Sequence, residues 1–221
     1  MTPPEAERAS GEPASGTPAP AGGSAPEGAL APEGAPAGEA ARLIPGFVAE
    51  SDLEARVTED PELLAGLAWG EPREAHPEGA VGIHVAQLLE EIDSDEETGE
   101  RRADLRFIAL VHDSFKYRVR NWLPRQGRNH HAMRARRFAE RYTDDERLLA
   151  TIEFHDRPYH LWKGMKKRGE LDSEALEEML GRVPDHVLFQ RFIEVDGASE
   201  AKNPGPIRWL RGELEQRRLL P

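Results

Sequence analysis

The stretch from Leu105 to Lys116, LRFIALVHDSFK, decides the fold. Its apolar residues Leu105 and Ile108 recur at helical spacing, and His112 comes next on the same stripe. The dipeptide His112–Asp113 therefore closes an apolar helix. A buried carboxylate is costly unless a metal ion or another cation compensates its charge. The stretch thus predicts a polar site at the end of a buried helix.

The same pattern, a metal-binding residue type on an apolar helix face, occurs in three other segments. The residues that repeat it are His84 in VGIHVAQLLEEI, His155 in ERLLATIEFH and Asp196 in VLFQRFIEVD. A single histidine on such a face is usually a core residue whose hydrogen bonds are satisfied. Four helices that repeat the pattern indicate a shared metal site instead.

The order of these residues resembles the HD superfamily of metal-dependent phosphohydrolases. His84, His112–Asp113 and Asp196 occupy the motif positions, and HDSFK is similar to the common HD-x-x-K. HPEGAVGIH, which ends at His84, is similar to the HPEG-x-V-x-x-H opening of HD domains in some bacterial tRNA nucleotidyltransferases. The resemblance covers roughly residues 72–210 and implies an HD-domain helical bundle with hydrolytic activity.

The resemblance also implies roles for single residues. His84, His112, Asp113 and Asp196 would hold one divalent ion, and a water or hydroxide would attack phosphorus. Asp113 would ligate the ion through one oxygen and orient the water with the other. Lys116 either holds a phosphate oxygen or is a lysine favoured by the helix C-terminus. Imidazole and carboxylate ligands without thiolate suit Mn, Fe, Co, Ni, Mg or Zn.

A second group of residues is similar to the extra ligands with which HD proteins hold a second metal ion or grip phosphate. Its members are His130, His131, His155 and Asp156. His130 and His131 are adjacent on a predicted helix, so only one is expected to face inward, and the apolar pattern favours His130. Asp156 either takes the inward place of His155 or forms an ion pair with Arg157.

The domain organisation follows from composition. Residues 1–41 consist almost entirely of Ala, Pro, Gly, Glu and Ser, which predicts a disordered tail. Residues 42–221 show helical spacing without strand alternation, so they are predicted to form one all-α domain. Within it, Ser51 or Asp52 and Asp60 are expected to begin short helices. Residues 155–169 are expected to form a long loop or a short broken helix.

Charge and composition narrow the function classes. The 221 residues carry a net charge of −12, which makes general nucleic-acid binding unlikely. Residues 101–141 nevertheless hold 12 Lys/Arg against 3 Asp/Glu, which favours a small phosphorylated substrate near the site. The absence of cysteine excludes disulfides and thiolate metal sites. With neither a signal peptide nor an apolar run of about 20 residues, a cytoplasmic protein without membrane contact is expected.

These observations predict an enzyme that hydrolyses a phosphomonoester or phosphodiester, with a small nucleotide-like substrate. The alternative is a regulatory HD module that senses a nucleotide with little turnover. RNA processing is a third reading, which the acid excess and the absence of a nucleotidyltransferase domain weaken. Tyr159 and Trp162 either stack on a base or belong to the core, and Arg73 and His76 either border the site or are solvated. The oligomeric state stays open.

Overall fold

The computed structural model describes residues 38–72, 79–94, 99–198 and 203–221, and every regular element in these ranges is a helix. The predicted all-α class is confirmed. The α-helices of the N-terminal part are α1 (Glu39–Leu43), α2 (Asp52–Val57), α3 (Pro61–Leu67), α4 (Val81–Ser94), α5 (Gly99–Val111) and α6 (His131–Ala139). The others are α7 (Glu146–Phe154), α8 (Arg157–Arg168), α9 (Ser173–Arg182), α10 (His186–Asp196) and α11 (Gly205–Gln216). The short 3-10 turns η1 (Lys116–Arg118) and η2 (Gly127–Asn129) lie between α5 and α6.

Side-chain caps set the start of five helices. The side chain of Ser51 accepts a hydrogen bond from the backbone of Glu54 at the start of α2, as the sequence predicted. Asp60 caps α3 in the same way, and Pro61 follows at the first helical position. Asp145, Asp172 and Asp185 cap α7, α9 and α10 in the same way. Local sequence therefore determines where these helices begin.

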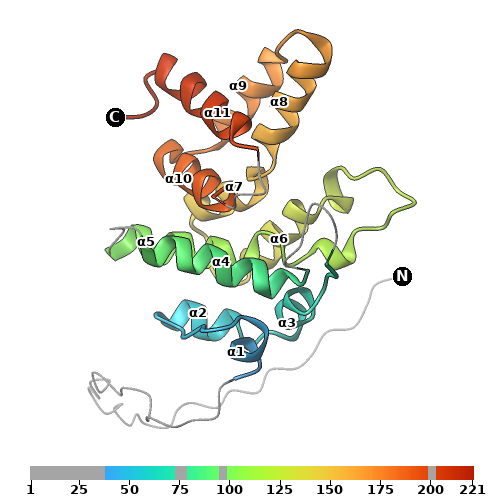
Figure 1. Cartoon of the computed structure of the whole chain (residues 1–221), viewed down its shortest axis with the longest axis vertical. Coiled ribbons are helices and arrows are strands. Elements are labelled where there is room, and N and C mark those ends of the chain that lie inside the picture. Colours follow the sequence, from blue (N-terminus) through green and yellow to red (C-terminus); the bar gives the residue numbers. More distant parts are fainter. Residues whose placement is uncertain (1–37, 73–78, 95–98, 199–202) are drawn as a thin grey trace, which may run out of the picture. The chain divides into compact units, whose positions relative to one another are not determined.

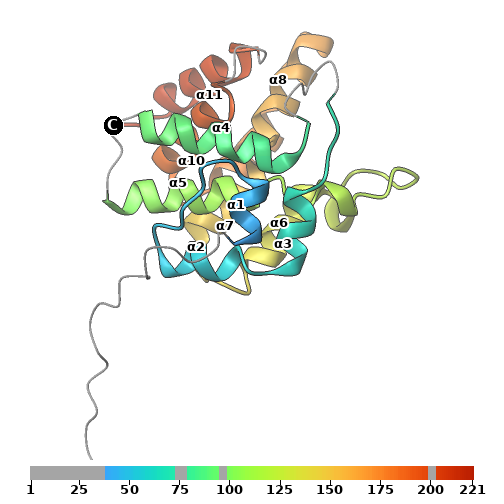
Figure 2. The same ribbon diagram turned by 60° about the horizontal axis from the view of Figure 1, so that its bottom comes forward.

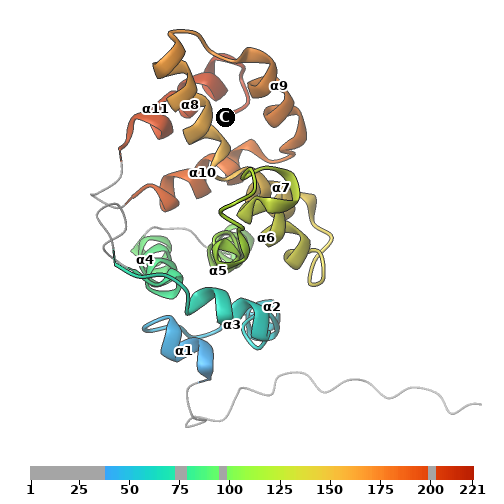
Figure 3. The ribbon, with the colours of Figure 1, turned by 90° about the vertical axis from the view of Figure 1, so that its right-hand side faces the viewer.

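Helices α4 and α5 lie side by side at the centre of the arrangement (Figure 1). Helices α1, α2 and α3 pack on one side of them, and α7 and α10 pack on the other (Figure 3). Figure 2 turns the molecule so that α1, α2 and α3 come to the front. Helix α8 packs against α9 and α11, beyond α10. The four helices that carry the predicted ligands therefore meet near α5.

Two apolar clusters hold these helices together. The larger is formed by α1 to α7 and by one face of α10, where Phe192 is fully buried. The smaller lies under α8, α9 and α11, and Phe189 from the other face of α10 belongs to it. Helix α7 also contributes to both clusters, through Ile152 and Ala150. Because α7 and α10 join the two clusters, their ends are fixed relative to α4 and α5.

Two glycines let the backbones of neighbouring helices touch. A Cβ added to Gly66 in α3 would stand 1.7 Å from the carbonyl oxygen of Ser114, directly after His112–Asp113. A Cβ on Gly82 in α4 would stand 2.3 Å from the carbonyl oxygen of Leu43. Real Cβ atoms do not approach so closely, so both positions require glycine. The backbone contact at Gly66 fixes α3 against the turn that carries Asp113.

The structure corrects two predicted boundaries. The predicted disorder concerns mainly residues 1–37, which lie outside the described residues, but Glu39–Leu43 form α1 with Ala40 buried. The residues predicted as a loop or broken helix contain the continuous helix α8. Pro158 stands in its first turn, where proline is tolerated, and Gly169 ends it with a φ of 78°. Among the described residues, no helix combines the length and apolar character that crossing a membrane would need.

Candidate metal centre

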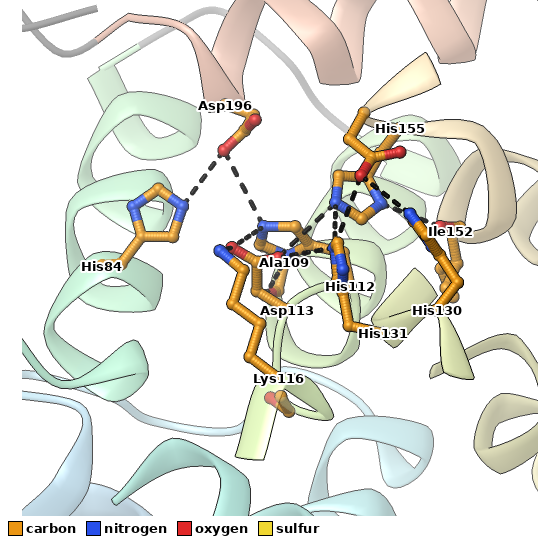
Figure 4. A network of polar contacts seen from close by, with 12 residues as sticks. His84, Ala109, His112, Asp113, Lys116, His130, His131, Ile152, His155 and Asp196 are labelled. Atoms are coloured by element: carbon orange, nitrogen blue, oxygen red, sulfur yellow. Dashed lines mark hydrogen bonds and ion pairs between the residues drawn. The ribbon is translucent and has the colours of Figure 1, made fainter. Parts of the chain in front are cut away.

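The predicted ligands come from five helix ends and converge on one row (Figure 4). His84 lies in the first turn of α4, and His112 and Asp113 follow the last residue of α5. The other members of the row are His130 and His131 at the start of α6, His155 and Asp156 between α7 and α8, and Asp196 at the end of α10. Each of these side chains stands at or near the end of its helix. The backbone N–H or C=O groups there have no partner within the helix, so the chain can leave the helical path.

One end of the row brings together the four residues expected to hold the first ion. Ligand atoms of His84, His112 and Asp113 all lie within 4.8 Å of one another. Nε2 of His112 is 3.5 Å from Oδ2 of Asp113. Oδ1 of Asp196 lies 3.0 Å from Nε2 of His84 and 3.7 Å from Nε2 of His112. These nitrogen and oxygen atoms could hold a metal ion.

The second group shares Asp113 with the first. Oδ1 of Asp113 lies 3.3 Å from Nε2 of His131 and 3.5 Å from Nε2 of His155. The two histidine nitrogens are 3.3 Å apart. Asp113 therefore turns one oxygen toward each group, and this second trio could also hold an ion.

The hydrogen bonds around the row suit a metal. Nδ1 of His112 donates to the carbonyl oxygen of Ala109 at 3.0 Å, and Nδ1 of His155 donates to that of Ile152 at 2.8 Å. When the imidazole is neutral, each bond fixes the tautomer in which Nε2 carries a lone pair facing the row. Nε2 of His112 and Oδ1 of Asp113 are buried and lack a hydrogen-bond partner among the described residues. Buried polar atoms are rarely left without a partner, and one ion in each group would satisfy them: the first at His112, the second at Oδ1 of Asp113.

Both His130 and His131 face the row, in contrast to the expectation that only one of the pair would face inward. Their rings stack with centroids 4.7 Å apart, and Nε2 of His130 and of His131 lie 3.3 and 3.8 Å from Oδ2 of Asp156. Of the two, His131 is the one that contacts Asp113 within the described residues, whereas His130 joins His131 and Asp156 in a third trio that could hold an ion. His130 precedes α6 with an extended backbone, so helical spacing does not set its direction. Asp156 thereby takes histidine partners, His160 at 3.5 Å included, and of its two alternatives the ion pair with Arg157 is not formed within the described residues.

Burial and charge shift the pKa values of the row. Burial lowers the pKa of His112 to about 3, which keeps its imidazole neutral and able to ligate. Burial alone would raise the pKa of Asp113, but the Lys116 cation and His112 hold it well below its usual range. Burial would lower the pKa of His155, but the Asp113 and Asp156 carboxylates raise it to about 9 in the protein without metal. Asp113 is therefore charged, as a ligand must be, and His155 would release its proton on binding a metal ion.

Lys116 lies where the row meets a cavity of about 530 Å³. Its ammonium group donates to Oδ2 of Asp113. The cavity wall also includes His84 and Trp69, whose exposed fraction is 40%. Sequence reasoning missed Trp69, because no motif surrounds it and only the fold brings it beside Lys116.

The basic excess of residues 101–141 does not gather at the row. Five of its arginines form ion pairs with carboxylates outside the row, and they are Arg102, Arg106, Arg118, Arg136 and Arg141. Two other cations of this range border cavities at the row, Lys116 the first and Arg125 the second. Tyr159 and Trp162 contact lysine side chains on α8 and line neither cavity at the row. Arg73 and His76 lie outside the described residues.

No protein-family model matches the chain, and it matches neither a curated protein nor a solved structure.

Proposed function

We propose that the protein is a metal-dependent phosphohydrolase that acts on a small phosphorylated substrate. The observation that carries this proposal is the shared carboxylate Asp113, which separates two histidine groups and faces each with one oxygen. Two ligand groups joined by one carboxylate suit two divalent ions, an arrangement common in enzymes that hydrolyse phosphate esters. The ligand types allow Mn, Fe, Co, Ni, Mg or Zn.

His84, His112, Asp113 and Asp196 would hold the first ion, and Asp113, His131 and His155 the second. Such ions, when bound, activate a water molecule and polarise a phosphoryl oxygen. The chain itself orients the two groups through the carbonyl oxygens of Ala109 and Ile152. It also excludes water from His112, which is fully buried.

Lys116 would bind a phosphate oxygen of the substrate. Its side chain is 27% exposed and borders the cavity of about 530 Å³, so a ligand in that cavity can reach it. Asp113 lies beside it and holds the pKa of the ammonium group above its usual range against the effect of burial. A permanent cation next to the row stabilises the phosphate both when bound and in the transition state.

The proposal is tested by phosphate release from a panel of phosphate esters with each of the six metal ions. The Lys116→Ala variant should keep its metal and lose catalytic efficiency, whereas Lys163→Ala, on the exposed surface of α8, should lose neither. A rise mainly in KM would assign Lys116 to binding, and a fall mainly in kcat would assign it to the transition state. Saturable nucleotide binding without release under every condition would contradict the enzyme and favour the regulatory alternative.

A further inference from the structure

The row of ligands ends in a cavity on each side. The first cavity, of about 530 Å³, is lined by His84, Asp113 and Lys116. The second, of about 480 Å³, is lined by His130, Asp156 and side chains from α6, α7, α8 and α9. Figure 4 shows His84 and His130 at opposite ends of the row, with Asp113 between them. Each cavity is large enough for an organic group of the size found in small ligands.

The polar atoms between the cavities form a continuous chain. The ammonium group of Lys116 donates to Oδ2 of Asp113, and Oδ1 of Asp113 lies 3.3 Å from Nε2 of His131. Oδ2 of Asp156 lies 3.8 Å beyond Nε2 of His131 and 3.3 Å from Nε2 of His130, which borders the second cavity. A phosphorus atom bound along this chain would therefore have space on both sides.

The second cavity has an apolar floor and a polar rim. Met133, Phe154 and Met179 supply the floor, and Met179 is almost fully buried. Arg157 stands at the rim, is exposed, and forms no ion pair within the part of the chain that the structure describes. Glu153 also lines the cavity, but Arg136 and Arg182 neutralise it. The cavity suits a flat or aliphatic group with a polar edge.

We propose that the second cavity binds a second ester substituent, so that the preferred substrate is a phosphodiester. A phosphomonoester carries one organic group and needs one cavity, whereas a diester carries two. In the reaction the oxygen of a water molecule forms a bond to phosphorus, and the opposite ester P–O bond breaks. The electron pair leaves with the departing oxygen, which ends with one proton from the water. The products are a phosphomonoester and an alcohol. This inference rests on the proposed function.

The test compares bis(p-nitrophenyl) phosphate with p-nitrophenyl phosphate on variants of Met133. Met133→Ala removes part of the cavity floor without touching a ligand of the row, and Met133→Leu keeps the apolar volume. Met165→Ala is the matched control, because Met165 is also a half-buried helix residue but lines neither cavity. Dissociation constants are measured on chelator-treated protein, so that hydrolysis does not interfere, and kcat/KM is measured with metal.

Met133→Ala should weaken diester binding about fivefold and leave monoester binding within about twofold. Met133→Leu and Met165→Ala should bind both esters like the wild type, and kcat/KM for the diester should fall only in Met133→Ala. Equal effects of Met133→Ala on both esters, or no effect on the diester, would overturn the inference. Release of p-nitrophenol from the monoester would then still support the proposed function. Absence of release from both esters would sink the proposed function, whereas the binding comparison would still decide the role of the cavity.

Discussion

Oδ1 of Asp113 lies 3.5 Å from Nε2 of His155, which follows it by 42 positions and stands at the end of α7, a helix that packs against α5. The other oxygen of Asp113 faces His112 and Lys116. One carboxylate therefore connects two groups of ligands that different helices supply. Loss of that carboxylate should affect both groups at once.

The first prediction concerns this connection. Asp113→Asn keeps the size of the side chain but removes its charge, so the affinity for divalent metal should fall at least about tenfold. Phosphate release should fall with it. Asp144→Asn, at an exposed carboxylate, should change neither quantity. The measurement is a titration of metal-free protein with Mn²⁺; an Asp113→Asn protein with wild-type affinity would show that Asp113 is not a ligand.

His131 and His130 should differ in their effect on metal content. His131→Ala removes a nitrogen that reaches both Asp113 and His155, so we expect loss of the second ion and retention of the first. His130→Ala removes a residue that contacts Asp156 but not Asp113, so both ions should stay. Elemental analysis of the two purified variants checks the difference. Equal stoichiometry in both would contradict the assignment of the second group.

Sequence spacing predicted the helix faces that carry His84, His112, His155 and Asp196. A helix that buries one face has apolar residues on that face, and they recur about every 3.6 residues in the sequence. Sequence spacing could not predict the directions of His130 and His131. Those depend on an extended backbone at the start of α6, which no period describes.

The close approach at Gly66 gives a prediction about stability. Gly66→Ala would place Cβ 1.7 Å from the carbonyl oxygen of Ser114, so the helix must shift and the free energy of unfolding should fall by about 2 kcal/mol or more. Gly212→Ala, in the middle of α11 with open space around Cβ, should raise it by about 0.5–1 kcal/mol. Urea denaturation of both variants measures these changes. A Gly66→Ala protein as stable as the wild type would disprove the backbone contact.

Asp104 gives a prediction about pH, away from the row. Burial raises the pKa of this carboxyl from 3.8 to about 6, and Arg147, 3.2 Å away, offsets part of that effect. The other charged groups that act on it are Glu100, Asp145 and Asp185. Because its pKa is higher in the folded state, the stability it contributes is present below pH 3.8 and is lost as pH rises through about 6.

Asp104→Asn should therefore gain stability relative to the wild type as pH rises from about 4 to 8, by roughly 2–3 kcal/mol, because the shift from 3.8 to about 6 already includes the opposing effect of Arg147. Denaturation at several pH values measures the difference. A difference that is constant with pH, or that shrinks as pH rises, would show that Asp104 ionises as easily in the folded protein as in the unfolded chain.

The parts that sequence reasoning missed depend on contacts between distant segments. Composition counted Arg102 and Arg106 in the basic excess, but Glu50 and Glu54, from the loop before α2 and from α2, form ion pairs with them. The helix over Arg157–Arg168 was missed because its proline stands in the first turn, where it does not break a helix. Trp69 lines the same cavity as Lys116, from the segment after α3, which packs on Ser114.

The central claim, that the row holds divalent metal, is tested most directly by anomalous diffraction from crystals grown with Mn²⁺. We expect a peak within about 2.3 Å of Nε2 of His112 and of an Asp113 oxygen, and a second peak beside His131 and His155. The peak at His112 should disappear in Asp113→Asn crystals. Crystals that bind Mn²⁺ elsewhere but show no anomalous density between His112 and Asp113 would contradict the claim.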